Sequence, residues 1–148
     1  MNKFEDVIKT VTDIADAYCP GVKALGAYTA YVKTKLPRLI EGSVDIDACT
    51  EKLYPNANRW DYVISFKGKA YYLEVHPATA GEVRNVVAKK AWLVDWLGKK
   101  AKALDAYPSA KQKFTWVPSG KFGLSKTSRE YRMIATRGLR LESYLNLS

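Results

Sequence analysis

The sequence contains one histidine and only two cysteines among its 148 residues. Cys19 and Cys49 are too few for a disulfide framework and too far apart for the closely spaced pairs of a structural zinc site. No apolar run approaches the roughly 20 residues that span a bilayer, and the acidic, amphipathic N-terminus does not resemble a secretory signal. We therefore expect a soluble, cytoplasmic protein with reduced thiols and no membrane partner.

The net positive charge lies entirely in the second half of the chain. Residues 1–78 carry ten Lys/Arg and ten Asp/Glu, whereas residues 79–148 carry fourteen Lys/Arg and five Asp/Glu, which accounts for the whole net charge of +9. A basic surface of this kind suits a polyanion, because binding phosphates releases condensed counterions. A solvated, lysine-rich surface with no such partner would give the same composition.

The pattern of apolar residues predicts an α/β protein with a single domain over residues 1–148. We expect helices over residues 1–40, including one at about 22–36, then strands at 43–48, 60–66 and 70–76. A long helix should follow over 79–106, then a strand at 113–118, a loop, and a short helix from Arg129 to Arg137. The end of the chain, residues 138–145, is compatible with an edge strand or a helix. The core thus lies in residues 43–118, followed by a basic C-terminal segment, 119–148.

The register of the expected hairpin decides which side chains meet around the histidine. If Gly68 and Lys69 form a two-residue type II′ turn, Asp61 pairs with His76 and lies diagonal to Glu74. Because side chains alternate across a strand, Asp61, Glu74 and His76 then share one face. A three-residue turn without a bulge would instead put Asp61 on the opposite face from Glu74.

Two carboxylates on a mostly apolar sheet repel each other and need compensation. Mg²⁺, or Mn²⁺ in its place, would supply it through oxygen ligands from Asp61 and Glu74. A metal-bound water is a nucleophile, and the cation can offset charge that develops on a phosphate. A structural ion pair between Glu74 and Lys67 or Lys89 would compensate the same charge, and Asp61 would then be a loop-end cap.

The segment "RWDYVISFKGKAYYLEVH" resembles the core motif of the PD-(D/E)XK, or restriction-endonuclease-like, nuclease superfamily. That family has an Asp on one strand and a (D/E)-x-K triplet on the next, within an αβββαβ core whose mixed sheet is flanked by helices. Asp61 matches the Asp, Glu74 the acidic residue of the triplet, and His76 stands in the place of the lysine. The resemblance covers about residues 40–118, and the pattern D…E-x-[K/H] alone has low specificity.

The resemblance implies that Asp61 and Glu74 bind the metal together with the carbonyl of Val75. It also implies a further acidic ligand, for which Glu41, Asp45 and Asp47 are available. His76 departs from the family because a histidine is mostly neutral at pH 7, so it cannot be the permanent cation that a lysine is. It could act as a general base, and Lys89 or Arg84 could supply the missing charge; His76 could equally cap the sheet through a hydrogen bond.

Seven basic residues are candidates for contacts to a nucleic-acid backbone. They lie on the long helix, on the following strand and in the C-terminal segment. They are Lys89, Lys113, Lys121, Lys126, Arg129, Arg132 and Arg137.

Three functions remain open at this point. The first is a Mg²⁺-dependent nuclease in which Asp61, Glu74 and His76 are the catalytic residues and DNA or RNA is the substrate. The second is a nuclease-fold module that has lost catalysis and binds nucleic acid or a protein. The third is a small interaction protein, such as an inhibitor, with an acidic partner. Since many nucleases of this fold pair up to cut two strands, the resemblance also allows a homodimer.

Overall fold

The computed structural model describes residues 2–148, apart from the side chain of Lys121. A six-stranded mixed sheet has the order β1-β3-β4-β5-β6-β7, and β2 and β8 form a separate pair. The strands are β1 (Cys19–Pro20), β2 (Val32–Thr34), β3 (Ile40–Asp45), β4 (Tyr62–Phe66), β5 (Lys69–Thr79), β6 (Ser109–Gly123), β7 (Arg140–Leu141) and β8 (Leu145–Leu147). The helices are α1 (Lys3–Thr10), α2 (Ile46–Thr50), α3 (Val83–Lys100), α4 (Lys102–Ala106) and α5 (Arg129–Thr136). Short 3₁₀ segments are η1 (Thr12–Ile14), η2 (Lys23–Tyr31), η3 (Pro37–Leu39) and η4 (Ala80–Glu82).

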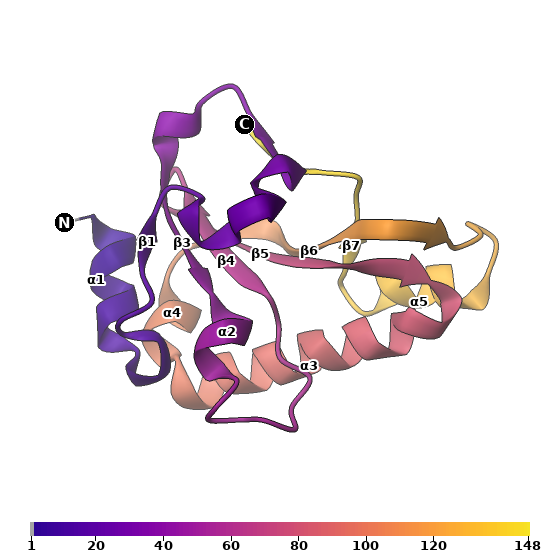
Figure 1. Cartoon of the computed structure of the whole chain (residues 1–148), viewed down its shortest axis with the longest axis horizontal. Coiled ribbons are helices and arrows are strands. Elements are labelled where there is room, and N and C mark those ends of the chain that lie inside the picture. The colour runs from indigo at the N-terminus through magenta and orange to yellow at the C-terminus, as the bar shows by residue number, and fades with distance from the viewer. Residues whose placement is uncertain (1) are drawn as a thin grey trace.

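The sheet separates two apolar layers. The helix α3 runs along one face together with α5, while η2 and the β2–β8 pair lie on the other side (Figure 1). The pairs β1–β3, β3–β4 and β4–β5 are antiparallel, whereas β5–β6 and β6–β7 are parallel. The expected α/β class, with helix–strand–strand–strand–helix–strand order around a mixed sheet, is confirmed.

The burial of the central strands follows from their residue composition. All five residues of β4 are buried, as expected for an apolar, β-branched segment with layers on both faces. In β5, Tyr72 packs toward α3 and Leu73 toward η2, so successive side chains enter different layers. Glu74 is fully buried in this strand, in the layer beneath α3. A buried carboxylate in such a strand needs a specific partner.

The N-terminal region differs from the sequence prediction. The helix expected at 22–36 is instead η2, which is interrupted at Gly26 (φ +54°), followed by the strand β2. Only a residue that tolerates a left-handed backbone can make this interruption without strain. Strand β2 pairs in parallel with β8, from the far end of the chain, and a local sequence pattern carries no signal of that pairing.

The C-terminal region is also more extended than predicted. A loop is expected from residue 119, but β6 continues to Gly123. Its last residues are held in the sheet because Phe122 and Gly123 pair with Ala78 and Thr79 of β5. The short helix is confirmed as α5, with Ser128 accepting a hydrogen bond from the amide of Tyr131 at its N-terminus. The last segment forms β7 and β8, which resolves the open alternative in favour of strands. Within residues 2–148, no helix combines the length and apolar character needed to cross a bilayer.

Candidate functional site

The β4–β5 hairpin has a different turn from the one predicted. Lys67 and Gly68 are its two central residues, both with positive φ (50° and 73°), and Phe66 pairs with Lys69. Two positive φ values define a type I′ turn, which suits the twist of paired strands. The register shifts, and continuing it past the Tyr62–Leu73 pair places Asp61 opposite Glu74 rather than His76. Compared with the predicted register, the partner of each β4 residue moves by two positions along β5. Because side chains alternate with a period of two, Asp61 and Glu74 still share a face.

Asp61 and Glu74 are held together by backbone hydrogen bonds. The amide of Asp61 donates to Glu74 Oε1 at 3.1 Å, and the amide of Val75 donates to Asp61 Oδ2 at 3.0 Å. Each carboxylate therefore has one oxygen fixed by the main chain of the other strand. Asp61 Oδ1 and Glu74 Oε2 remain for another partner.

That partner is Lys89, which reaches down from α3. Its Nζ lies 2.7 Å from Glu74 Oε2 and 3.9 Å from Asp61 Oδ1. Glu74 is fully buried, while the side chains of Asp61 and Lys89 are 16% and 18% exposed. Despite the short distance, Glu74 Oε2 has no hydrogen-bond donor in good geometry among the described residues. The buried Glu74 side chain is thus placed beside a cation but is incompletely hydrogen-bonded.

Burial dominates the electrostatics of both carboxyl groups. It raises the pKa of Glu74 to about 8, with a further increase from the nearby charge of Asp61, although Lys89 acts in the opposite direction. The pKa of Asp61 rises to about 6 for the same main reason. The two carboxylates raise the pKa of Lys89 against the effect of its own burial. Carboxyl groups that titrate near neutral pH are typical of functional sites, although structural networks also produce them.

His76 lies at the edge of this cluster and forms a bridge to a second glutamate. Its Nε2 lies 3.1 Å from Glu82 Oε2, and its Nδ1 lies 3.7 Å from Glu74 Oε2. The hydrogen bond with His76 lowers the pKa of Glu82. The His76 carbonyl accepts a hydrogen bond from Trp116 Nε1 at 2.8 Å, which ties β5 to β6 at this level. The histidine is thus a hydrogen-bonded residue next to the carboxylates, with the half-buried Glu82 as its closest partner.

The donor set can be compared with what Mg²⁺ requires. Asp61 Oδ1 and Glu74 Oε2 are hard oxygen atoms that face the same point, and the incompletely hydrogen-bonded, buried Oε2 suits a cation. Within the described residues, no group of three or more acidic, histidine or cysteine side chains is arranged for a metal. A hard cation would therefore have two protein carboxylates and otherwise water or substrate, and Lys89 would have to move aside.

The additional acidic residues considered from the sequence have other partners. Glu41 Oε1 accepts hydrogen bonds from Ser65 Oγ and from the amide of Gly68 at the hairpin turn. Asp45 caps α2 by accepting from the amide of Ala48, and Asp47 pairs with Arg59 at 2.7 Å. None of the three adds a ligand to the Asp61–Glu74 pair. Asp47 and Asp45 act on the site at a distance, because their charges raise the pKa of Asp61.

The residues predicted to contact nucleic acid do not form one group. Lys89 belongs to the carboxylate cluster. Lys113 lies on β6, with its ammonium 5.3 Å from the centre of the Phe114 ring. The exposed side chains of Lys126, Arg129, Arg132 and Arg137 are distributed before, along and just after α5. The side chain of Lys121 lies outside the described part of the structure.

Comparisons with family models, with curated proteins and with solved structures give no match to this chain. The site is therefore interpreted from its own geometry.

Sequence reasoning named Lys89 both as a nucleic-acid contact and as an ion-pair partner of Glu74, and the structure shows the ion pair, at 2.7 Å. A signal for its inward position exists in the sequence. Val86, Lys89 and Leu93 are spaced by three and four residues, so Lys89 lies on the apolar face of α3, as does its neighbour Lys90 by the same spacing. A lysine on such a face is compatible with a buried carboxylate opposite it, and Lys89 has one in Glu74. The role of Glu82 beside His76 had no comparable signal, because it depends on how η4 joins β5 to α3.

Proposed function

We propose that this protein is a metal-dependent nuclease of the PD-(D/E)XK type, in which the lysine function is supplied by Lys89 from α3. The observation that supports this proposal is the convergence of the Asp61 and Glu74 carboxylates with the Lys89 ammonium on two strands and the following helix. The order of elements around the sheet is the one expected for that superfamily. Asp61 and Glu74 match the acidic residues of its motif, whereas the lysine position is His76 and the cation comes from α3.

Each residue has a defined role in this proposal. Asp61 Oδ1 and Glu74 Oε2 would hold Mg²⁺, which, when bound, supplies an ionised water and offsets charge on the scissile phosphate. Lys89 would move off Glu74 and stabilise negative charge that develops in the transition state. Because the pKa of Glu74 is about 8, its proton must leave before the pair can bind a cation. His76, paired with Glu82, lies where it could accept a proton from water.

A second candidate function is favoured by one observation. The Lys89 ammonium already provides the positive charge that the two carboxylates need, at 2.7 Å from Glu74. In that case the cluster is a structural ion pair in a module that binds nucleic acid through the basic residues of its second half. The two candidates differ in metal binding, since only the first requires Lys89 to leave.

The deciding experiment is a calorimetric titration of Mn²⁺ into the protein at pH 9 and at pH 6. The nuclease proposal predicts binding at pH 9 that weakens strongly at pH 6, where Glu74 keeps its proton. Asp61→Asn and Glu74→Gln should abolish the binding. Glu51→Gln, at an exposed position in the turn after α2, is the matched control and should bind like the parent.

Activity is then tested on labelled DNA and RNA, single- and double-stranded, with Mg²⁺ at pH 9. Cleavage that disappears in Lys89→Gln and persists in Glu51→Gln supports the nuclease proposal. Absence of Mn²⁺ binding at both pH values refutes it. Nucleic-acid affinity that falls steeply with salt would then support the binding module.

A further inference from the structure

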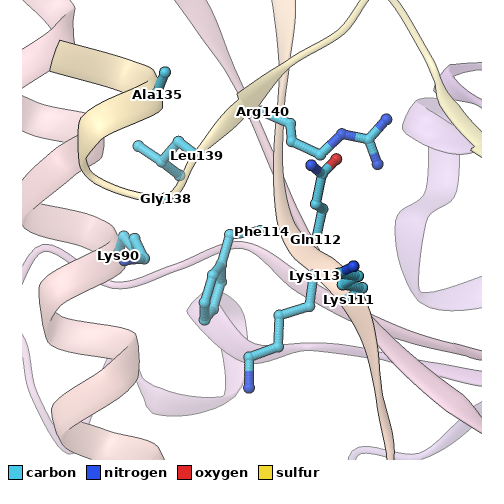
Figure 2. A pocket seen from close by; sticks show the side chains of 9 residues that line it. All are labelled: Lys90, Lys111, Gln112, Lys113, Phe114, Ala135, Gly138, Leu139 and Arg140. Carbon is cyan, nitrogen blue, oxygen red and sulfur yellow. The ribbon is translucent and has the colours of Figure 1, made fainter.

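A second site of concentrated charge borders the same helix, α3, where Lys90 follows Lys89 of the carboxylate cluster. It is a pocket of about 480 Å³ between α3, the start of β6 and the segment that joins α5 to β7 (Figure 2). This volume lies within the range of about 300–1,000 Å³ that is usual for small-ligand sites. Its lining is Lys90, Lys111, Gln112, Lys113, Phe114, Ala135, Gly138, Leu139 and Arg140.

The lining carries four cations and no carboxylate. Among the ion pairs of the described residues, none involves Lys90, Lys111 or Lys113, whereas Arg140 pairs with Glu142 at 3.2 Å. Scattered surface lysines are screened by salt and need no partner. Here the cations come from three separate elements, α3, β6 and β7, and line one pocket.

Two of the ammonium groups are held close to the same ring. Lys90 Nζ and Lys113 Nζ lie 5.1 and 5.3 Å from the centre of the Phe114 ring, which stands in the middle of the pocket in Figure 2. The π face of the ring attracts a cation but carries no net charge that could neutralise two of them. Burial lowers the pKa of Lys90, and the nearby charges of Arg137 and Lys113 lower it further.

The backbone keeps space for Lys90 at this point. Gly138 ends α5 with φ +74°, and a Cβ built on it would lie 3.2 Å from Lys90 Nζ. The amides of Gly138 and Leu139 donate back to the carbonyls of Ala135 and Ile134, which closes the helix end. A helix C-terminus is weakly negative, so it favours the charged form of Lys90 but supplies no full counter-charge.

We propose that this pocket binds a phosphate monoester, carried either by a free nucleotide or by the end of a nucleic-acid strand. A monoester dianion matches several convergent cations better than a single phosphodiester charge does. Lysine ammonium groups and the arginine fork both form charge-assisted hydrogen bonds with phosphate oxygens. The proposal goes beyond the nuclease function and does not depend on it, because the pocket shares no residue with the Asp61–Glu74–Lys89 cluster.

The test is a fluorescence-anisotropy titration, in EDTA and moderate salt, with single-stranded DNA of about ten nucleotides. Three forms of one sequence are compared: with a 5′-phosphate, with a 3′-phosphate, and with hydroxyl groups at both ends. Competition by inorganic phosphate and by adenosine 5′-monophosphate distinguishes a free ligand from a strand end. EDTA removes metal-dependent cleavage, so failure of the nuclease proposal and failure of this one give different results.

The expected result is at least about tenfold tighter binding of a phosphorylated form, lost in Lys90→Gln and in Lys113→Gln. Lys100→Gln, on the same helix but about 15 Å further along, removes an equal charge and should retain the preference. Competition by the mononucleotide at similar concentration would identify a free nucleotide as the ligand, and its failure to compete would identify a strand end. Equal affinity for all three DNA forms, equal loss in Lys100→Gln, or no binding would overturn the proposal.

Discussion

Glu74→Gln should change how the stability of the protein depends on pH. The unfolded chain releases the Glu74 proton near the ordinary value of 4.5, whereas the folded protein keeps it up to about pH 8. Between these values the folded state binds more protons, so its stability falls as pH rises. The contribution of protonated Glu74 to the free energy of unfolding is fully present below pH 4.5 and is lost by the time the pH passes 8.

The size of the effect follows from the same two values. At about 1.4 kcal/mol per pH unit, ionising Glu74 in place costs the folded state on the order of 5 kcal/mol. A glutamine does not titrate, and its side-chain oxygen can still accept from the Asp61 amide. The free energy of unfolding of Glu74→Gln, relative to the parent, should therefore increase by up to roughly this amount between pH 4.5 and pH 9.

Urea denaturation at pH 4.5, 6, 7.5 and 9 measures this difference, followed by tryptophan fluorescence. In thermal unfolding, the midpoint of the variant should move upward relative to the parent by roughly 10–20 °C at pH 9. Glu51→Gln is the control and should run parallel to the parent at every pH. A constant difference between Glu74→Gln and the parent would refute the reasoning, because Glu74 would then be ionised throughout as an ordinary partner of Lys89.

Four further substitutions test other parts of the structure by the same denaturation assay. Lys89→Gln leaves the Asp61 and Glu74 carboxylates without a cation, so it should lower the free energy of unfolding by a few kcal/mol at pH 9. The loss should be much smaller at pH 5, where Glu74 is protonated. Equal losses at both pH values would contradict this. Gly42→Ala should lower the free energy of unfolding by roughly 1–3 kcal/mol, because its Cβ would overlap the Tyr18 ring. Gly98→Ala in α3 meets no atom and should raise it by roughly 0.5–1 kcal/mol. A change of the same sign in both variants would be inconsistent with the packing. Lys67→Asn puts Asn-Gly into the type I′ turn and should stabilise by roughly 0.5–1 kcal/mol, and a loss would argue against that turn type.

Much of the central fold could be predicted from the sequence because its signals are local. The apolar run of β4, the alternating β5 and the long α3 each specify their own secondary structure, and their order specifies a mixed sheet. The hairpin illustrates the limit of such reasoning. Gly68 predicted a turn, but only the backbone shows that Lys67 adopts positive φ, and that one detail sets the register.

The candidate site was predictable in part for the same reason. Strand alternation brings Asp61 and Glu74 to one face in either two-residue register, so their proximity did not depend on the turn. The position of Lys89 depends on the rotation of α3 against the sheet. Along α3, Leu93 and Trp96 are buried, whereas the equally apolar Val94 is 49% exposed. With that rotation, Lys89 turns toward the carboxylates.

The parallel pairing of β2 with β8 has a consequence for how the chain folds during synthesis. Val32 pairs with Leu145, which follows it by 113 positions. At about 5–20 residues per second, a ribosome needs roughly 6–20 s to add the residues that separate them. Throughout that interval the apolar side chains of η2 and β2 lack the cover that Leu145 and Leu147 later provide. This layer should therefore assemble last, and in the cell it is the part of the nascent protein most exposed to chaperones and proteases.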